Sequence, residues 1–150
     1  MTNPKGTAGE TAFVRWANRH GFPGAERKVK YGSRDQGDVN LCPGVVAEIK
    51  NYRLPTGVPT DGQLEAWMAQ AAVEKANAGA ALCPLIVKRP GTTDVGRWFA
   101  YLPMGDFALL TGAFLPMDLD DAPMMLTVAA LTAVLRSCGY GNPLASEMSA

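Results

Sequence analysis

The chain has 150 residues, of which 47% are hydrophobic, and its 14 basic side chains balance 14 acidic ones. These values predict one packed domain and exclude a multidomain protein or a largely disordered chain. The longest apolar stretch runs from Met124 to Leu135, contains two threonines and is shorter than the ~20 residues of a bilayer span. We therefore expect a soluble protein with no membrane partner.

The cysteines and the start of the chain bear on metal binding and location. Cys42, Cys83 and Cys138 lie far apart and His20 is the single histidine, so the sequence argues against a zinc cluster. An odd number of cysteines and a start without a signal-peptide pattern favour reduced thiols. These features predict a cytoplasmic protein, and we expect the cell to be bacterial or phage-infected.

The neutral total charge conceals an uneven distribution. Residues 1–53 hold nine basic and five acidic side chains, whereas residues 54–150 hold five basic and nine acidic ones. The first third therefore carries a formal charge of +4 and is the part expected to attract a polyanion.

Local patterns predict helices and strands along the first two thirds of the chain. Thr7 and Glu10 form a capping-box pattern, which predicts a helix over 7–20. Apolar residues at three- and four-residue steps predict a second helix over 63–78, ended by Gly79. Strand patterns cover 26–31, 38–41, 45–52, 82–88 and 97–102, and we expect the last two to pair antiparallel.

The last third is expected to contain a linker and one helix. The segment after residue 102 is rich in Gly, Pro and Asp, which is typical of a linker. Three aspartates between 118 and 121 precede Pro123, as is common at the positive end of a helix dipole. We expect a helix through the apolar run, ending near Arg136, buried in the core or against another subunit. The elements together predict an α/β fold with a central sheet.

Three residues on two predicted strands point to metal-assisted chemistry. Glu48 and Lys50 are two apart on a strand, so their side chains leave the same face. Asp38 lies on the preceding strand, and a turn at residues 43–44 would place its carboxylate beside Glu48. Two carboxylates this close need a cation, and oxygen ligands without His or Cys favour Mg²⁺. Lys50 would orient or deprotonate a water or stabilise charge on a phosphate, which is typical of phosphodiester hydrolysis.

Glu10 is a further candidate for this site. It shares a helix face with Phe13, Val14 and Ala17, which predicts that its carboxylate points toward the core and needs a partner or a metal. The capping box gives a second reason for an acid at this position, and the sequence leaves both open.

These residues resemble a known family. Lys5-Gly6-x-x-x-Glu10, Gly37-Asp38-Val39 and Val46-Ala47-Glu48-Ile49-Lys50-Asn51 look like the PD-(D/E)XK nuclease superfamily, and within it the archaeal-type Holliday junction resolvases. The resemblance covers about residues 5–103. Gly37 stands where the family has a proline, and the part after about Thr111 has no counterpart.

The resemblance implies a fold and an activity. The fold would be a single nuclease domain over 1–150, with a restriction-endonuclease-like mixed sheet flanked by helices in a core of about 5–103. The rest, about 104–150, would be a helical extension with the extra C-terminal apolar helix. The activity would be two-metal, Mg²⁺-dependent cleavage of four-way DNA junctions in recombination and repair by a homodimer, with Mn²⁺ as a substitute for Mg²⁺.

The resemblance also implies site residues. Glu10, Asp38, Glu48 and Lys50 would be catalytic, with metal bound by the three carboxylates and the backbone carbonyl of Ile49. Contacts to DNA are expected from Lys5, Arg27, Lys28, Lys30, Ser33, Arg34, Asn51 and Arg53, although the basic members of this set would also suit a solvated face. Gln63 and Gln70 follow on the next helix and stay outside the expected catalytic set, since Gln70 fits either the site or the surface.

Two other functions remain open from the sequence. One is a restriction-like or DNA-end-processing nuclease that uses the same site on duplex or single-stranded DNA. The other is a non-catalytic DNA-binding or assembly module that uses only the basic face. A short chain has little surface for reading bases, which favours recognition of DNA shape.

Overall fold

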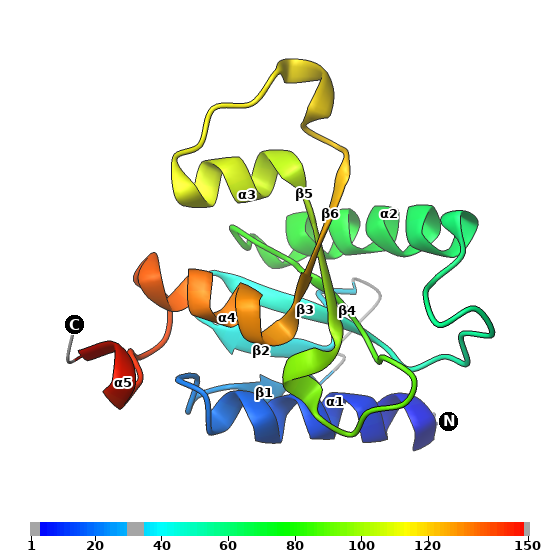
Figure 1. Ribbon diagram of the computed structural model, residues 1–150, viewed down its shortest axis with the longest axis horizontal. Coiled ribbons are helices and arrows are strands. Elements are labelled where there is room, and N and C mark those ends of the chain that lie inside the picture. Colours follow the sequence, from blue (N-terminus) through cyan, green and yellow to red (C-terminus); the bar gives the residue numbers. More distant parts are fainter. Residues whose placement is uncertain (1–3, 30–34, 149–150) are drawn as a thin grey trace.

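The computed structural model describes residues 4–29 and 35–148, and this part of the chain forms a six-stranded mixed sheet with helices packed on it (Figure 1). The helices are α1 (Pro4–Asn18), α2 (Asp61–Ala78), α3 (Met104–Thr111), α4 (Val128–Ser137) and α5 (Ala145–Met148). The strands are β1 (Glu26–Arg27), β2 (Val39–Cys42), β3 (Val45–Lys50), β4 (Leu85–Val87), β5 (Phe99–Pro103) and β6 (Pro123–Thr127). The expected α/β class is confirmed.

The strands lie in the sheet in the order in which they occur in the chain, β1-β2-β3-β4-β5-β6. β3 and β4 are parallel, and the other described pairs are antiparallel. A parallel pair needs a crossover connection, and α2 provides it between β3 and β4. The expected antiparallel pairing of β4 and β5 is confirmed.

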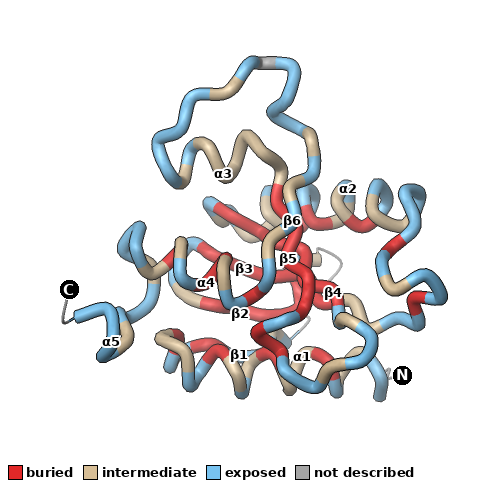
Figure 2. Tube along the Cα trace, in the orientation of Figure 1, coloured by how far each residue is buried: buried red, intermediate tan, exposed pale blue. Residues whose placement is uncertain are grey.

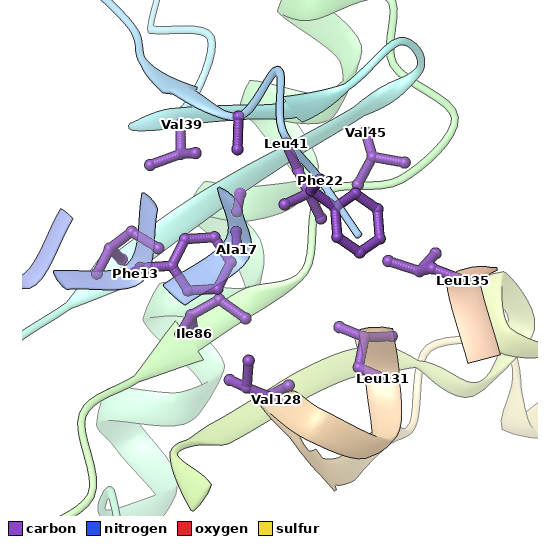
Figure 3. Close-up of a cluster of buried hydrophobic side chains, with 14 of the residues drawn as sticks. Phe13, Ala17, Phe22, Val39, Leu41, Val45, Ile86, Val128, Leu131 and Leu135 are labelled. Atoms are coloured by element: carbon purple, nitrogen blue, oxygen red, sulfur yellow. The ribbon is translucent and has the colours of Figure 1, made fainter. Parts of the chain in front are cut away.

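The two sides of the sheet are covered by different helices. α1 and α4 lie on one side, where Phe13, Ala17, Leu131 and Leu135 join the large apolar core (Figure 3). α2 lies on the other side, where Trp67 packs in a smaller cluster that includes two β4 and two β5 side chains. Because strand side chains alternate between faces, every central strand contributes to both sides.

β3 shows this alternation most clearly. Val45, Ala47 and Ile49 point into the large core beside α1, and Val46 packs with Ala71 of α2 on the opposite side. The next two side chains on the α2 side are those of Glu48 and Lys50. A strand buried along five of its six residues thus carries two ionisable groups on one face.

α2 has strong signals at both ends. The Thr60 side chain accepts a hydrogen bond from the Gln63 backbone N–H, while the Gln63 side chain accepts one from the Thr60 backbone N–H. Gly79 closes the helix in the left-handed conformation, with φ of 61°. The predicted helix over 63–78 is confirmed with an earlier start, and Gln63 acts as a capping residue.

The N-terminal predictions need two corrections. α1 already includes Pro4, which suits the first turn of a helix, so Thr7 and Glu10 lie inside the helix and the capping box is wrong. The strand predicted over 26–31 is assigned only at Glu26–Arg27, where it pairs with β2, and residues 30–34 lie outside the described residues.

The C-terminal predictions were wrong in two places. The expected linker contains helix α3, and the first half of the apolar run is strand β6 rather than helix. β6 pairs with β5 over five residues, which satisfies the backbone of β5, and this long-range pairing overrides local helical pattern. The helix starts only at Val128, where the Thr127 side chain accepts from the Ala130 N–H.

The segment between β5 and β6 forms an arm that extends from the body of the molecule (Figure 2). Leu109 and Phe114 on this arm are 86% and 96% exposed.

Across residues 4–29 and 35–148, none of the helices combines the length and the apolar character that a membrane span would require. α4 is amphipathic, and Val128, Leu131 and Leu135 on its inner face are buried in the large core.

Candidate functional site

A cluster of polar side chains lies between β3 and α2. β3 contributes Glu48 and Lys50, and α2 contributes Gln70 and Glu74. The carboxylate of Asp38 reaches the same region from the residue just before β2. The cluster separates two small apolar groups on this side of the sheet, so little water surrounds it.

Lys50 and Glu48 form an ion pair. Lys50 Nζ lies 3.0 Å from Glu48 Oε1 and donates a hydrogen bond to Gln70 Oε1 at 2.8 Å. The side chains of Lys50 and Glu48 are 11% and 4% exposed. The lysine ammonium also lies 5.9 Å from the centre of the Trp67 ring. The predicted sharing of one strand face is confirmed, and the pair is buried.

Asp38 is held by the backbone of β3. β2 and β3 form the expected antiparallel hairpin, in which Val39 is opposite Ala47. Asp38 Oδ2 accepts a hydrogen bond of 2.8 Å from the Ile49 backbone N–H, and the residue is 8% exposed. Its charge acts on Glu48, so the hairpin brings the two acids close together as predicted.

The Ile49 carbonyl faces the same edge as Asp38. Glu48 N–H donates to Pro84, and the Lys50 carbonyl accepts from Lys88, so these groups point toward β4. Peptide groups alternate in direction along a strand, and the Ile49 N–H therefore points the other way, to Asp38. The Ile49 carbonyl lies on that side too, which is where the predicted ligand set requires it.

Gln70 joins the cluster although sequence reasoning left it out. Its Nε2 donates to Glu48 Oε1 at 3.0 Å and to Glu74 Oε1 at 2.8 Å. Glu74 is also a member that sequence reasoning missed, and it is 0% exposed. A signal was present, because Glu74 falls on the buried stripe of α2 with Trp67 and Ala71, at a position where an apolar residue is expected.

Burial and neighbouring groups shift the pKa values of Glu48 and Glu74 in this cluster. Burial raises the pKa of Glu48 to about 9, the hydrogen bond to Glu74 and the charges of Asp38 and Glu74 contribute in the same direction, and Lys50 opposes them. Burial also raises the pKa of Glu74, and it raises that of the Cys83 thiol, which lies 4.0 Å from Glu74. In the metal-free protein, burial therefore favours the protonated form of this pair of glutamates.

The donor set at Asp38 and Glu48 suits a hard cation. Glu48 Oε2 is buried with no hydrogen-bond donor among the described residues, so a shared proton or a bound cation is needed to satisfy it. The described part of the chain has no group of three or more His, Cys, Asp or Glu arranged to hold a metal ion. Mg²⁺ commonly takes one or two carboxylates and completes its shell with water and substrate phosphate, which these residues allow.

Glu10 lies on α1, which packs on the other side of β3. Its Oε2 accepts a hydrogen bond of 2.8 Å from Arg27 Nε, and its side chain is 17% exposed. Glu10 is partly buried, and a cation of β1 is a partner of its carboxylate. A metal-binding role for Glu10 stays a prediction.

The residues expected to contact DNA are only partly described. Arg27 pairs with Glu10, Lys28 Nζ donates to Gln36, and Arg53 is exposed. The Asn51 side chain donates to the backbone carbonyl of Lys5, which ties the end of β3 to the start of α1. The remaining three, Lys30, Ser33 and Arg34, lie outside the described residues.

Comparison of the chain with family models, with curated proteins and with solved structures gave no match.

Proposed function

We propose that the protein is a metal-dependent endodeoxyribonuclease of the PD-(D/E)XK type with a restriction-endonuclease-like fold. The observation that carries this proposal is the buried Glu48–Lys50 pair on a central strand, with Asp38 beside it. A buried charge lowers stability unless it is paired, and apolar side chains at both positions would give a more stable sheet. Chemistry rather than packing therefore accounts for these two residues.

The ligands proposed for Mg²⁺ or Mn²⁺ are Asp38, Glu48 and the Ile49 carbonyl, with Glu10 as a further candidate. When bound, the ion supplies a Lewis acid that polarises the scissile phosphate. Lys50 lies beside Glu48 and its side chain is the more exposed of the two, so its ammonium can stabilise negative charge on phosphate or exchange a proton with the attacking water. Gln70 holds the Lys50 ammonium in place.

The proposed substrate is a four-way DNA junction cut in recombination or repair by a homodimer in the cytoplasm. Residues 1–53 carry a formal charge of +4 and include the site residues Asp38 and Glu48. This positive charge supports binding to the DNA backbone. Backbone contacts carry no base sequence, so recognition would rest on the shape of the junction. Two copies would place two sites on the two strands that must be cut.

The test compares end-labelled four-way junction, linear duplex and single-stranded DNA, each with Mg²⁺, Mn²⁺ or EDTA. We expect paired, symmetric cuts in the junction that need the metal and disappear in Glu48→Gln, with junction binding retained. Glu65→Gln is the matched control, because Glu65 is an exposed acid on α2. Equal cutting of linear DNA would indicate a restriction-like or end-processing nuclease, and binding without any cutting would indicate the non-catalytic module.

A further inference from the structure

Glu74 is a buried carboxylate to which the proposed hydrolysis assigns no role. Its side chain is 0% exposed and lies on α2, one turn after Gln70. Glu74 Oε1 accepts the hydrogen bond from Gln70 Nε2, and Oε2 lies 4.0 Å from the Cys83 thiol. A fully buried acid costs free energy, so its presence on an otherwise apolar stripe calls for a function.

The contacts of Gln70 fix the orientation of its amide. The Lys50 ammonium has only donors, so it must face Gln70 Oε1. The carboxylates of Glu48 and Glu74 both accept from Gln70 Nε2, which uses both N–H groups of the amide. Rotating the amide by 180° would break all three hydrogen bonds, and Glu74 supplies the one partner that lies outside the Glu48–Lys50 pair.

Because Gln70 contacts Glu48 and Lys50 at the same time, its position sets the geometry of that ion pair. Without an acceptor at residue 74, one Nε2 proton would lose its partner in a buried site, and the amide would turn or shift to regain one. Either movement removes the acceptor that holds the Lys50 ammonium. Glu74 thus acts on Lys50 and Glu48 through the amide between them.

We propose that Glu74 is a positioning residue that locks the Gln70 amide and thereby holds Lys50 and Glu48 in register for phosphodiester hydrolysis. This inference rests on the proposed nuclease function and adds a residue to its site. The role requires an acceptor atom at position 74 and does not require a negative charge there. That distinction separates a positioning residue from a metal ligand.

Two substitutions of similar size test the requirement. Glu74→Gln keeps a side-chain oxygen that accepts from Gln70, whereas Glu74→Met keeps the length and removes the acceptor. We expect Glu74→Gln to retain kcat within about threefold and Glu74→Met to lose about 10- to 100-fold in kcat with little change in KM, as for supporting residues around metal sites. Glu65→Met, on the exposed face of α2, is the control and should leave kcat unchanged.

A double variant tests whether Glu74 acts through Gln70. If Glu74 affects kcat through the amide and not through its direct contact with Glu48, Gln70→Ala and Gln70→Ala/Glu74→Met should have the same kcat, because the amide is already absent. A further loss in the double variant would overturn the proposal, as would a fully active Glu74→Met. If Glu74→Gln were as inactive as Glu74→Met and needed more Mg²⁺ for half-maximal rate, Glu74 would be a direct ligand and the positioning role would be wrong.

A spectroscopic readout keeps this proposal separate from the nuclease function. NMR can follow the side-chain amide signals of Gln70 in the metal-free protein, which are assigned by their loss in Gln70→Ala. We expect the amide hydrogens to exchange slowly with water. We expect their chemical shifts to change in Glu74→Met and to stay the same in Glu74→Gln. This pattern in a protein that cuts no DNA would support the locked amide and refute the nuclease function. Unchanged signals in Glu74→Met would overturn the locked amide whether or not the protein cuts DNA.

Discussion

The two sides of the central sheet differ in how their side chains pack. On the side of α1 and α4, one continuous apolar core joins Phe13, Ile49, Ile86 and Leu131. On the side of α2, two small apolar clusters are separated by the polar group around Glu48. Glu48 and Glu74 are buried, so exposure to water does not explain these polar side chains.

The difference separates the side of the sheet that stabilises the fold from the side that holds the proposed site. The α1 and α4 side removes apolar area from water, which is the main source of folding free energy. The α2 side buries carboxylates that repel one another and raise the pKa of Glu48, which lowers stability. A sequence that tolerates such a cost at one place commonly has a functional site there.

Truncation on the apolar side should have the largest effect on stability. Phe13 is 1% exposed and Phe114 of the arm is 96% exposed, so the same substitution can be made at both. We expect Phe13→Ala to lower the free energy of unfolding by about 3–5 kcal/mol and Phe114→Ala to change it by less than about 0.5 kcal/mol. Urea unfolding measures both, and similar losses would contradict the division between core and arm.

Removal of the Asp38 carboxylate should have a smaller effect on stability and a large effect on cleavage. Asp38→Ala leaves the Ile49 N–H without its acceptor and should cost about 1–3 kcal/mol, whereas Asp38→Asn keeps an oxygen acceptor and should be close to wild type. Both variants should lose metal-dependent cleavage.

A matched control for the Asp38 variants is available in the connection between β4 and β5. Asp94 accepts in the same way from the Gly96 N–H, at 2.9 Å, at the start of the short helix Val95–Arg97. Asp94→Ala should lose stability and keep cleavage. A stable, active Asp38→Ala would place the metal site elsewhere.

The pH dependence of stability tests the raised pKa of Glu48. Because the pKa of Glu48 is higher in the folded protein than its ordinary value of 4.5, the folded state binds more protons than the unfolded state between about pH 5 and 9. The free energy of unfolding of the metal-free protein should therefore fall as pH rises through this range.

Urea unfolding in EDTA at pH 6, 7.5 and 9 measures this slope. Glu48→Gln should flatten it, and Glu65→Gln should leave it unchanged. Added Mg²⁺ should stabilise the wild type most at high pH, because the ion competes with the shared proton. A slope of opposite sign in the metal-free wild type would contradict the raised pKa of Glu48.

Much of the first 103 residues could be predicted from local signals. The turn at residues 43–44 implied the hairpin, the spacing of Glu48 and Lys50 implied a common face, and Gly79 marked the end of a helix. These features depend on period and backbone conformation, which neighbouring residues determine. The predictions from residue 104 onward failed because the sequence signals for α3 are weak and because β6 forms only where the edge of β5 is available for pairing.

The site was predictable only where its residues share one strand or hairpin. Gln70 and Glu74 lie more than 20 residues after Glu48, and their contact with it depends on the path of the α2 crossover. Arg27 as the partner of Glu10 likewise depends on how α1 packs against β1. Such contacts between distant segments leave no periodic trace in the chain.

The sequence by itself determined the α/β class, the hairpin and the pair of charges on one face of β3, because side-chain alternation and turn chemistry act over a few residues. Only the tertiary structure decided that this face is buried under α2, that an amide and a third carboxylate complete the cluster, and that an apolar run divides into a strand and a helix. Burial is a property of the packed elements together, and it is burial that raises the pKa of Glu48 and makes the group suited to chemistry.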